Sequence, residues 1–460
     1  MTSRLDPLLR PSSIALIGAS AKAGKIGNAV LTNLLAGDRT VYLVNPNENE
    51  ILGRKCYSSV KEVTGVVDLA IIVLPASASV SATRECVAKG VRAVIVSASG
   101  FSETGKAGLQ LERELLDAIR GSETRILGPN AMGVFVPSIS LDTLFIPKDR
   151  SRRPCPGTVA MISQSGAVAV SFMEKAAASG LGISACVCVG NKSDIDEMDL
   201  MQYFEEDSGT NCMAMYLESF SDGRRFIELS KKMSSSMPIV LVKSGGTPAG
   251  ARAARSHTGA ISASSDPVVN GALRQAGVTR AREEEDLVDL CRAFSVMNYL
   301  RGGRICIVAS AGGFGVMASD LVESNETAPS LSMAVPSEKT SSALRSVVPD
   351  FTSVQNPIDL TAGVTDEMYD EVLAILQTDP GIDAILMSLE LQPPNVTRQL
   401  IEIAGRRSAG PKPIVASVFA GDQATALTEA ASAGLPAFPT IRRCVRALNA
   451  LVERGMHLSR

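Results

Sequence analysis

The chain has 460 residues, of which 45% are hydrophobic and 20% charged, with 45 lysines and arginines against 48 aspartates and glutamates. This is the composition of an ordinary soluble protein with room for several domains, and its net charge of −3 provides no basic field for nucleic acid or an anionic membrane. The first residues lack the apolar core of a signal peptide and no apolar run could span a bilayer, so we expect a cytoplasmic protein with reduced cysteines. With two histidines and no CxxC pair, no metal site is expected.

Short β-rich apolar runs alternate with helix-like segments along the whole chain and fall into three series. Continuous hydrophobic strands that alternate with helices are typical of parallel sheets covered on both faces. The sequence therefore predicts a doubly wound α/β fold repeated three times. The predicted strands begin near residues 13, 41, 69, 93 and 125, then near 159, 183, 213 and 238, and finally near 304, 384 and 413.

Two breaks in this pattern mark the expected domain boundaries. Residues 136–157 contain several prolines and a basic cluster, which argues against a long sheet element, and a second break surrounds residues 298–304. The domains are therefore expected at 1–136, 157–298 and 303–460. Within the last, the Ser- and Pro-rich residues 327–357 are expected to form a long excursion with a short helix at 338–345.

Glycine-rich and polar loops follow the predicted strands of the first domain, at the edge where open α/β sheets bind ligands. Residues 18–27 open onto a helix whose backbone N–H groups could hold a phosphate, although the loop has neither GxGxxG spacing nor a Walker motif. An ordinary strand-to-helix turn is the alternative. Asn45, Pro75 and Asn130 end successive strands and are expected to converge on the same edge.

The later domains repeat this device. The strand near 159 leads into Gln164, Ser165 and Gly166, and the strand near 304 leads into Gly312 and Gly313. Each glycine-opened helix presents an anion site at its N-terminus, unless the glycines serve only close packing of helix on sheet.

Acidic residues fall into two groups. Glu218 ends the apolar strand near 213, where a carboxylate can orient an imidazole, and a solvated loop carboxylate is the alternative. The run DIDE at 194–197 is expected to form an exposed loop, with cation binding as the alternative, and the run EEED at 283–286 a solvated helix start.

His257 stands out because the chain has only one other histidine, His457, close to the C-terminus. It lies in the run SHTG among small, turn-forming residues. An imidazole, whose pKa lies near neutrality, can act as nucleophile, proton carrier or ligand. A packing or surface histidine is the alternative.

Taken together, these stretches resemble the NDP-forming acyl-CoA synthetases, in particular the α subunits of the ADP-forming acetate–CoA ligases, which are relatives of succinyl-CoA synthetase. The resemblance covers essentially the whole chain and rests on the order and spacing of its motifs. These are IGAS at 17–20, GKIG at 24–27, LGPN at 127–130, SQSG at 163–166, GNK at 190–192, YLE at 216–218, KSGG at 243–246, SHTGA at 256–260 and NPID at 356–359.

The resemblance implies an N-terminal Rossmann-like CoA-binding domain followed by two flavodoxin-like CoA-ligase domains. It implies that His257 is transiently phosphorylated and that Glu218 orients it. The implied phosphate-binding residues are Ser165, Gly166, Gly312 and Gly313, and the implied CoA-binding residues are Gly18, Ser20, Lys25, Asn45, Pro75 and Asn130.

The resemblance also implies an acid–thiol ligase that converts a small carboxylic acid, CoA and ATP into acyl-CoA, ADP and phosphate. No part of the chain resembles the family's ATP-grasp domain, so ATP and Mg²⁺ are expected to bind a separate ATP-grasp β subunit in an α2β2 assembly. The alternative is that the chain has lost the full reaction. The acid and the physiological direction do not follow from the sequence. One rival is a non-catalytic CoA-binding regulatory protein. The other, a nicotinamide dehydrogenase, is disfavoured by the glycine spacing and by Asn45 where an acidic residue would be needed.

Overall fold

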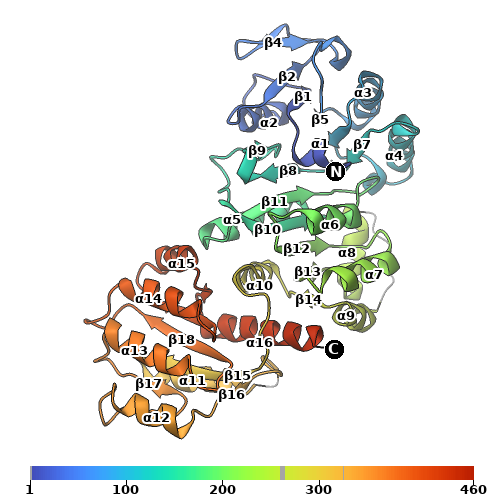
Figure 1. Ribbon diagram of the computed structural model, residues 1–460. Helices are drawn as coiled ribbons and strands as arrows, with labels where there is room; N and C mark the ends of the chain where they lie inside the picture. Colours follow the sequence, from blue (N-terminus) through green and yellow to red (C-terminus); the bar gives the residue numbers. More distant parts are fainter. Residues whose placement is uncertain (1–2, 259–264, 325, 460) are drawn as a thin grey trace. The chain divides into compact units, whose positions relative to one another are not determined.

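The computed structural model describes residues 3–258, 265–324 and 326–459 (Figure 1). The chain forms two compact units, the first comprising Met1–Ala177 and Gly182–Glu284 and the second Ala178–Leu181 and Glu285–Arg460. The first unit contains two sheets and the second unit one. Within the described ranges, no helix is long and apolar enough to cross a membrane.

The first sheet has the strand order β3-β4-β2-β1-β5-β6-β7. All pairings in it are parallel except that of β3 with β4. Its strands are β1 (Ser13–Ile17), β2 (Thr40–Val44), β3 (Glu50–Ile51), β4 (Arg54–Tyr57), β5 (Leu69–Ile72), β6 (Ala93–Val96) and β7 (Arg125–Leu127). The helices are α1 (Asp6–Leu9), α2 (Ile26–Leu34), α3 (Ala76–Lys89) and α4 (Lys106–Ile119), with short 3₁₀ turns η1 (Val60–Glu62) and η2 (Ser102–Thr104).

The second sheet has the order β14-β13-β12-β10-β11-β8-β9. Its strands are β8 (Gly133–Val136), β9 (Leu141–Asp142), β10 (Pro156–Ser163), β11 (Ile183–Cys188), β12 (Cys212–Leu217), β13 (Ile239–Lys243) and β14 (Val278–Arg280). The helices are α5 (Gly166–Ala178), α6 (Glu197–Glu206), α7 (Gly223–Met233), α8 (Pro248–Thr258) and α9 (Asp266–Gln275), with a 3₁₀ turn η3 (Pro137–Ile139).

Strand β8 lies before the boundary expected at residue 136, yet it pairs antiparallel with β11 of the second sheet. All four of its residues are buried there, which explains the pairing, because an apolar strand gains most where both of its faces are covered.

The third sheet, in the second unit, has the order β16-β15-β18-β19-β20, with β17 paired to β15. Its strands are β15 (Arg304–Ala309), β16 (Ser332–Met333), β17 (Ile358–Asp359), β18 (Ala384–Glu390), β19 (Ile414–Phe419) and β20 (Ala437–Phe438). The helices are α10 (Glu284–Val296), α11 (Gly312–Val322), α12 (Glu338–Arg345), α13 (Asp366–Leu376), α14 (Gln399–Ser408), α15 (Gln423–Ser432) and α16 (Ile441–Leu458).

Two predictions about this region are confirmed. The helix expected at 338–345 is α12, and the EEED run opens helix α10. Residues up to 298 were expected in the second domain, but α10 packs within the second unit from residue 285 onward. The ion pair between Asp289 on α10 and Arg443 on α16 helps to hold it there.

All three sheets are mainly parallel and contain a point where the strand order reverses. Counted in chain order, the parallel strands of the first sheet lie in the Rossmann-like order 3-2-1-4-5-6, and those of the second sheet, β11-β10-β12-β13-β14, lie in the flavodoxin-like order 2-1-3-4-5. In the third sheet β15 lies between β16 and β18 in the same way, and the short β17 also pairs with it. Ligands bind beyond the carboxyl ends of the strands at this reversal, which are β1 and β5, β10 and β12, and β15 and β18. The predicted doubly wound α/β fold is confirmed, and the topology predicts one binding position in each sheet.

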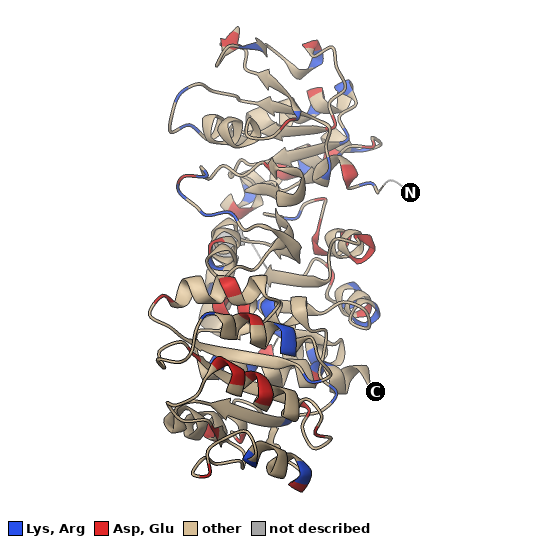
Figure 2. Cartoon of the chain, turned by 60° about the vertical axis from the view of Figure 1, so that its left-hand side comes forward, with Lys and Arg blue, Asp and Glu red and all other residues tan. Residues whose placement is uncertain are grey.

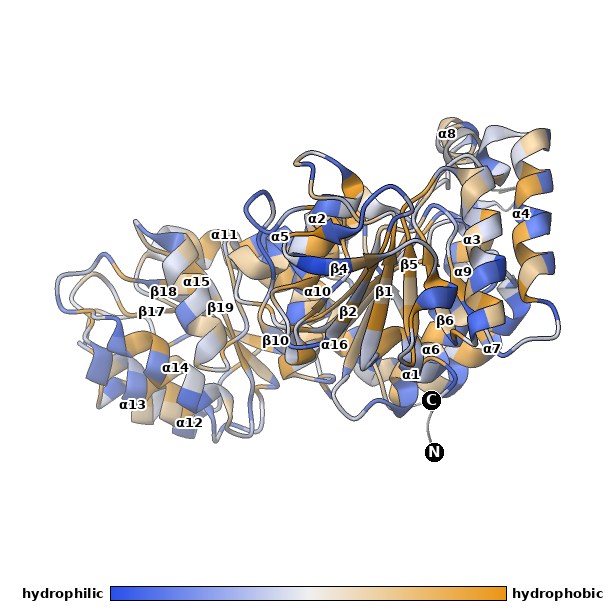
Figure 3. Cartoon of the chain, turned by 90° about the horizontal axis from the view of Figure 1, so that it is seen from above, coloured by the Kyte–Doolittle hydropathy of each residue, from blue (hydrophilic) through white to orange (hydrophobic). Residues whose placement is uncertain are grey.

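Hydrophobic residues form the central strands, and most charged residues lie on helices, loops and sheet edges. Strand β1 is buried along its whole length, and Figure 3 shows β1 and β5 of the first sheet as largely hydrophobic, whereas β4 near the edge is hydrophilic. Figure 2 shows lysine, arginine, aspartate and glutamate interspersed along helices and loops. Polar side chains near the strand ends therefore need a specific explanation, because most of the surrounding sheet is apolar.

Candidate functional site

A cavity of about 660 Å³ lies at the predicted binding position of the first sheet, beyond the carboxyl ends of β1 and β5. The loops after β1, β2 and β5 and one face of α3 enclose it. Four of the six residues implied in CoA binding line this cavity, namely Gly18, Ser20, Lys25 and Asn45. A cavity of this size can enclose a large part of a cofactor-sized molecule.

Two glycines let the loop after β1 approach the start of α2. Gly18 has a φ of +92°, and a Cβ atom on Gly27 would lie 2.0 Å from the carbonyl oxygen of Gly18. Lys25 occupies the N-cap position of α2, and its side chain makes no capping hydrogen bond. The first N–H groups of α2 and the Lys25 ammonium therefore suit an anion at this wall of the cavity.

Asn45 ties two of these loops together. Its Nδ2 donates to the carbonyl oxygen of Ala19 at 2.9 Å, and its Oδ1 accepts from the backbone N–H of Asn47 at 3.0 Å. The remaining two implied residues lie outside the cavity lining. Pro75 is the N-cap of α3, and Asn130, with a φ of +59°, faces the second sheet through Asn191.

The second sheet brings Glu218 and the loop 164–166 together at its own binding position. Strands β10 and β12 are neighbours, with Ser163 opposite Tyr216, so both segments leave adjacent strands at the same edge. Glu218 is only 4% exposed and Ser165 only 8%. Gln164 joins them directly, because its Oε1 accepts the backbone N–H of Glu218 at 2.9 Å.

The loop 164–166 is held tightly before helix α5 begins at Gly166. The hydroxyl of Ser163 donates to the carbonyl oxygen of Ser165 at 2.6 Å and accepts its backbone N–H at 3.2 Å. A Cβ atom at Gly166 would lie 3.3 Å from that of Met132, so the helix start lies close to the segment before β8. This geometry presents the N-terminus of a 13-residue helix beside Glu218.

The surroundings of Glu218 include two further titratable groups. The hydroxyl of Tyr216 donates to Glu218 Oε1 at 3.4 Å, and burial raises the pKa of Tyr216. Lys243 Nζ donates to the carbonyl oxygens of Glu218 and Ser244 at 2.8 and 2.6 Å. Burial lowers the pKa of Lys243, and the positive charge of Arg280 lowers it further.

His257 falls in the last turn of α8, which follows β13 in the same compact unit. Its side chain, and the residues 259 and 260 of the SHTGA motif, lie outside the part of the chain that the structure describes. Helix α8 packs against η2, the turn that follows β6 of the first sheet. The helix that carries His257 therefore lies against a loop of the predicted CoA-binding domain.

The prediction of an exposed loop at 194–197 is wrong. Asp194 accepts from the side chain of Arg125 and from the backbone of Ile126, and Asp196 caps helix α6. Glu197 is fully buried and pairs with Lys192. Sequence reasoning missed Lys192 and Lys243 as well, although both stand within the GNK and KSGG motifs that directly follow strands.

The third sheet repeats the arrangement of the second. Gly312 opens α11 after β15, and Glu390 ends the neighbouring strand β18, as Glu218 follows β12. The hydroxyls of Ser310 and Ser388 donate to the two oxygens of Glu390 at 2.7 and 2.6 Å. A Cβ atom at Gly313 would meet nothing within 4 Å, so the open side of this helix start lies at Gly313.

Comparison with known proteins agrees with this architecture. Family models match a CoA binding domain at residues 12–137, a succinyl-CoA ligase like flavodoxin domain at 156–294 and a ligase-CoA domain at 305–450. Acetate–CoA ligase [ADP-forming] I subunit alpha of Pyrococcus furiosus is 37% identical over 98% of this chain and 97% of its own length.

Two further relatives extend the comparison. Acetate–CoA ligase [ADP-forming] I of Archaeoglobus fulgidus is 34% identical over 97% of this chain, which spans 63% of that longer protein. The dinucleotide-forming acetyl-coenzyme A synthetase 1 of Candidatus Korarchaeum cryptofilum, solved with phosphate and ADP, has a TM-score of 0.89 and 33% identity, covering 99% of this chain and 97% of that one. As the sequence predicts, this chain belongs to the α-subunit family of the ADP-forming acetate–CoA ligases and, with it, to the acid–thiol ligases.

Proposed function

We propose that this chain is the catalytic α subunit of an ADP-forming acyl-CoA ligase, which makes acyl-CoA, ADP and phosphate from a small carboxylic acid, CoA and ATP. One observation carries the proposal. Glu218 and the helix start at Gly166 leave neighbouring strands, and the side chain of Gln164 spans the two. A buried carboxylate beside a helix N-terminus suits a histidine that gains and loses a phosphoryl group.

The cavity of the first sheet is the proposed CoA site. The N-terminus of α2 and Lys25 offer N–H groups and a positive charge to phosphate oxygens, and the apolar side chains Val44, Val73 and Leu74 offer contact to less polar parts of the molecule. Pro75 and Asn130 would act from outside the cavity lining, by shaping the loops that enclose it.

Three displacements at phosphorus and carbon account for the reaction. A ring nitrogen of His257 attacks the γ-phosphorus of ATP, the bond to ADP breaks, and Glu218 accepts a hydrogen bond from the other ring nitrogen. An oxygen of the substrate carboxylate then attacks the phosphorus, which frees His257 and gives an acyl phosphate. The CoA thiolate attacks the acyl carbon, and phosphate leaves with the bonding electrons.

The helix starts at Ser165–Gly166 and at Gly312–Gly313 would stabilise the phosphoryl charge during these steps. ATP and Mg²⁺ would bind an ATP-grasp β subunit in an α2β2 assembly. The existence of relatives named alpha subunits supports a partner of this kind.

Transfer of radioactive phosphate tests the proposal. With γ-³²P-ATP, Mg²⁺ and an ATP-grasp β subunit, the chain should acquire a label that is labile to acid and stable to base, as a phosphoramidate is. The chain without the partner should remain unlabelled by ATP but should accept label from acetyl [³²P]phosphate, because the second displacement is reversible. His257→Asn should abolish both kinds of labelling, and His457→Asn, on helix α16, should preserve them.

The outcomes separate the proposal from its rival. Acyl-CoA formation at the normal rate by His257→Asn would refute the phosphohistidine. CoA binding by a chain that neither accepts label nor supports ligation would indicate the regulatory protein instead. A panel of carboxylic acids, assayed for CoA-dependent release of ADP, would identify the substrate.

A further inference from the structure

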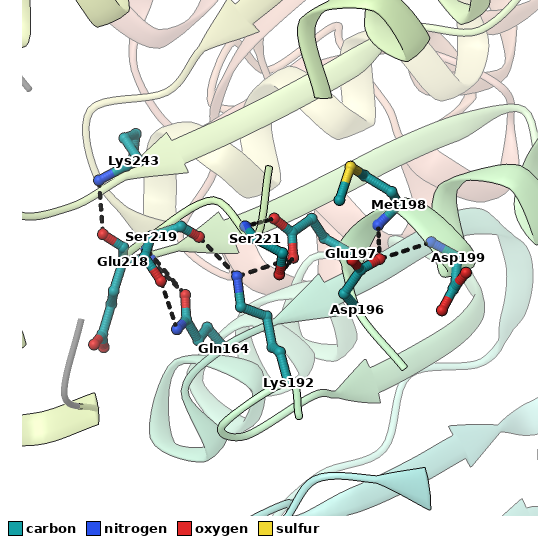
Figure 4. Close-up of polar contacts among 10 residues, drawn as sticks. All are labelled: Gln164, Lys192, Asp196, Glu197, Met198, Asp199, Glu218, Ser219, Ser221 and Lys243. Carbon is teal, nitrogen blue, oxygen red and sulfur yellow. Dashed lines mark hydrogen bonds and ion pairs between the residues drawn. The ribbon is translucent and has the colours of Figure 1, made fainter. Parts of the chain in front are cut away.

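The turn that carries Glu218 is bound by side chains from other segments (Figure 4). Gln164 Oε1 accepts the backbone N–H groups of both Glu218 and Ser219, at 2.9 and 3.1 Å, and its Nε2 donates to the hydroxyl of Ser219 at 3.2 Å. Lys243 holds the carbonyl oxygen of Glu218. Side chains therefore hold both the carbonyl and the N–H of the peptide that follows Glu218. The peptide before it is held by Gln164 and by the backbone N–H of Ser244, which donates to the carbonyl oxygen of Leu217 at 3.1 Å.

A buried ion pair fixes the next part of the same turn. Lys192 Nζ lies 2.9 Å from Glu197 Oε2, with side-chain exposures of 4% and 0%. Lys192 also donates to the carbonyl oxygen of Ser219 at 2.8 Å. Glu197 accepts the backbone N–H of Ser221 at 2.8 Å and its hydroxyl at 3.0 Å. The pair thus binds the turn at two points, one through each charge.

Both partners of the pair are placed by constrained backbone. Lys192 adopts a φ of +59°, and a Cβ atom at Gly190 would lie 2.2 Å from the carbonyl oxygen of Pro129, so the turn after β11 depends on these conformations. Asp196 caps helix α6 through two backbone N–H groups and so fixes Glu197 as the first helical residue. Both charged groups therefore reach the Glu218 turn from rigid supports.

We propose that the Lys192–Glu197 pair, together with the Gln164 amide, is the positioning device of Glu218, and that it sets the place of this carboxylate relative to the helix start at Gly166. The inference rests on the proposed function, in which Glu218 orients His257. Lys192, Glu197 and Gln164 act through Glu218 and are positioning residues rather than catalytic ones.

A role in stability alone accounts poorly for the pair. Removing two charges from water costs more than their attraction returns unless further hydrogen bonds are made, and apolar replacements of such pairs are often no less stable. Here every additional bond of the pair goes to the turn that holds Glu218. The geometry of that turn is therefore what the pair maintains.

A double-mutant cycle tests this proposal with the full-length chain. Lys192→Met and Glu197→Gln are introduced together, so that no single buried charge is left unpaired, and the rate of labelling by acetyl [³²P]phosphate is measured. We expect this rate to fall by about 10- to 100-fold, as for groups that orient a reactive residue. In the Glu218→Gln background, the same double substitution should change the rate by less than about twofold.

Two further variants test the role of the Gln164 amide and control for the loss of a buried ion pair. Gln164→Leu removes the amide without touching the ion pair, and it should show the same loss of rate and the same dependence on Glu218. Arg153→Met with Asp142→Asn removes another buried ion pair of the same compact unit, with exposures of 10% and 1% and a separation of 3.0 Å. This control should label at nearly the wild-type rate.

The affinity for CoA is measured by calorimetry in each variant and should stay within about twofold of the wild-type value. CoA binding at this affinity confirms that the unit is folded. The inference would be overturned if Lys192→Met/Glu197→Gln and Gln164→Leu lowered the labelling rate by the same factor in the Glu218→Gln background as in the wild-type chain. The residues would then act independently of Glu218. An unlabelled wild-type chain would overturn the proposed function, and this inference with it. If the wild-type chain is labelled but the substitutions lower the labelling rate independently of Glu218, this inference alone would be overturned.

Discussion

Replacement of Gly27 by alanine should weaken CoA binding by disturbing the cavity wall. The new Cβ atom would lie 2.0 Å from the carbonyl oxygen of Gly18, whereas the distance from a Cβ atom to a neighbouring heavy atom normally stays above 3.0 Å. Helix α2 and the loop after β1 must therefore separate by at least 1.0 Å. Gly18, Lys25 and Gly27 all line the cavity, so this shift moves the N–H groups that suit an anion. Overpacking of this kind costs about 1–3 kcal/mol.

Losing well-placed N–H groups from an anion costs about 1–3 kcal/mol, so the dissociation constant for CoA should rise by roughly 5- to 150-fold. Isothermal titration of the full-length chain with CoA measures this change, and circular dichroism confirms folding. Gly271→Ala is the matched control, because α9 carries this glycine in the same unit with no atom within 4 Å of the new Cβ. Unchanged CoA affinity in a folded Gly27→Ala chain would refute the assignment of this wall.

Three further predictions concern the catalytic turn, the cysteines and the third sheet. Glu218→Gln keeps the size of the side chain but removes the charge that would favour a positively charged imidazole, so labelling and overall turnover should fall by roughly 10²-fold with little change in CoA affinity. Of nine free cysteines only Cys155 is exposed, so Ellman's reagent should titrate one thiol in the native chain and nine in denaturant, and burial raises the pKa of Cys86 to about 12. Gly313→Ala should retain more ligation activity than Gly312→Ala, whose Cβ would lie 2.8 Å from Asp359 Oδ2.

The apolar runs predicted the main strands well, because parallel strands buried on both faces leave a continuous hydrophobic record in the sequence. The strand near 213, for example, is β12, and the strand near 384 is β18. Short strands near a sheet edge do not produce such a continuous apolar run. Strand β8 ends where the proline-rich break begins, and β9 lies within the break. Both strands are short, and β8 pairs antiparallel with β11 while β9 pairs antiparallel with β8.

The site was predictable where a motif follows a strand and less so where charges meet from distant segments. Glu218 and Ser165 were expected at strand ends, and the structure brings both to one edge of the second sheet. The DIDE run resembled a solvated loop because periodicity carries no information about partners. Arg125 comes from 69 residues away to bind Asp194, and this long-range pairing is what buries the run.

The turn η2, against which the helix of His257 packs, provides a last prediction about acid sensitivity. Glu103 Oε1 accepts the backbone N–H groups of Gly100 and Phe101 at 2.6 and 3.2 Å, and Oε2 accepts from Asn191 Nδ2 at 2.7 Å. Burial alone would raise the pKa of Glu103, but these hydrogen bonds outweigh it and hold the pKa below its ordinary value of 4.5. The ionised carboxylate therefore stabilises the turn.

Because the folded-state pKa lies below the unfolded one, this stabilisation is fully present above pH 4.5 and is lost as the pH falls through the folded value. Glu103→Gln removes the charge, so amide hydrogen exchange of residues 100–104 should be about tenfold faster than in wild type at pH 7, corresponding to about 1.4 kcal/mol for hydrogen bonds to a charged group. Comparing both proteins at each pH cancels the intrinsic pH dependence of exchange. The ratio should approach one once the pH has fallen below the folded-state pKa of Glu103, where both side chains are neutral. A ratio that stays tenfold there would show that the amide and the carboxylate differ in packing rather than in charge.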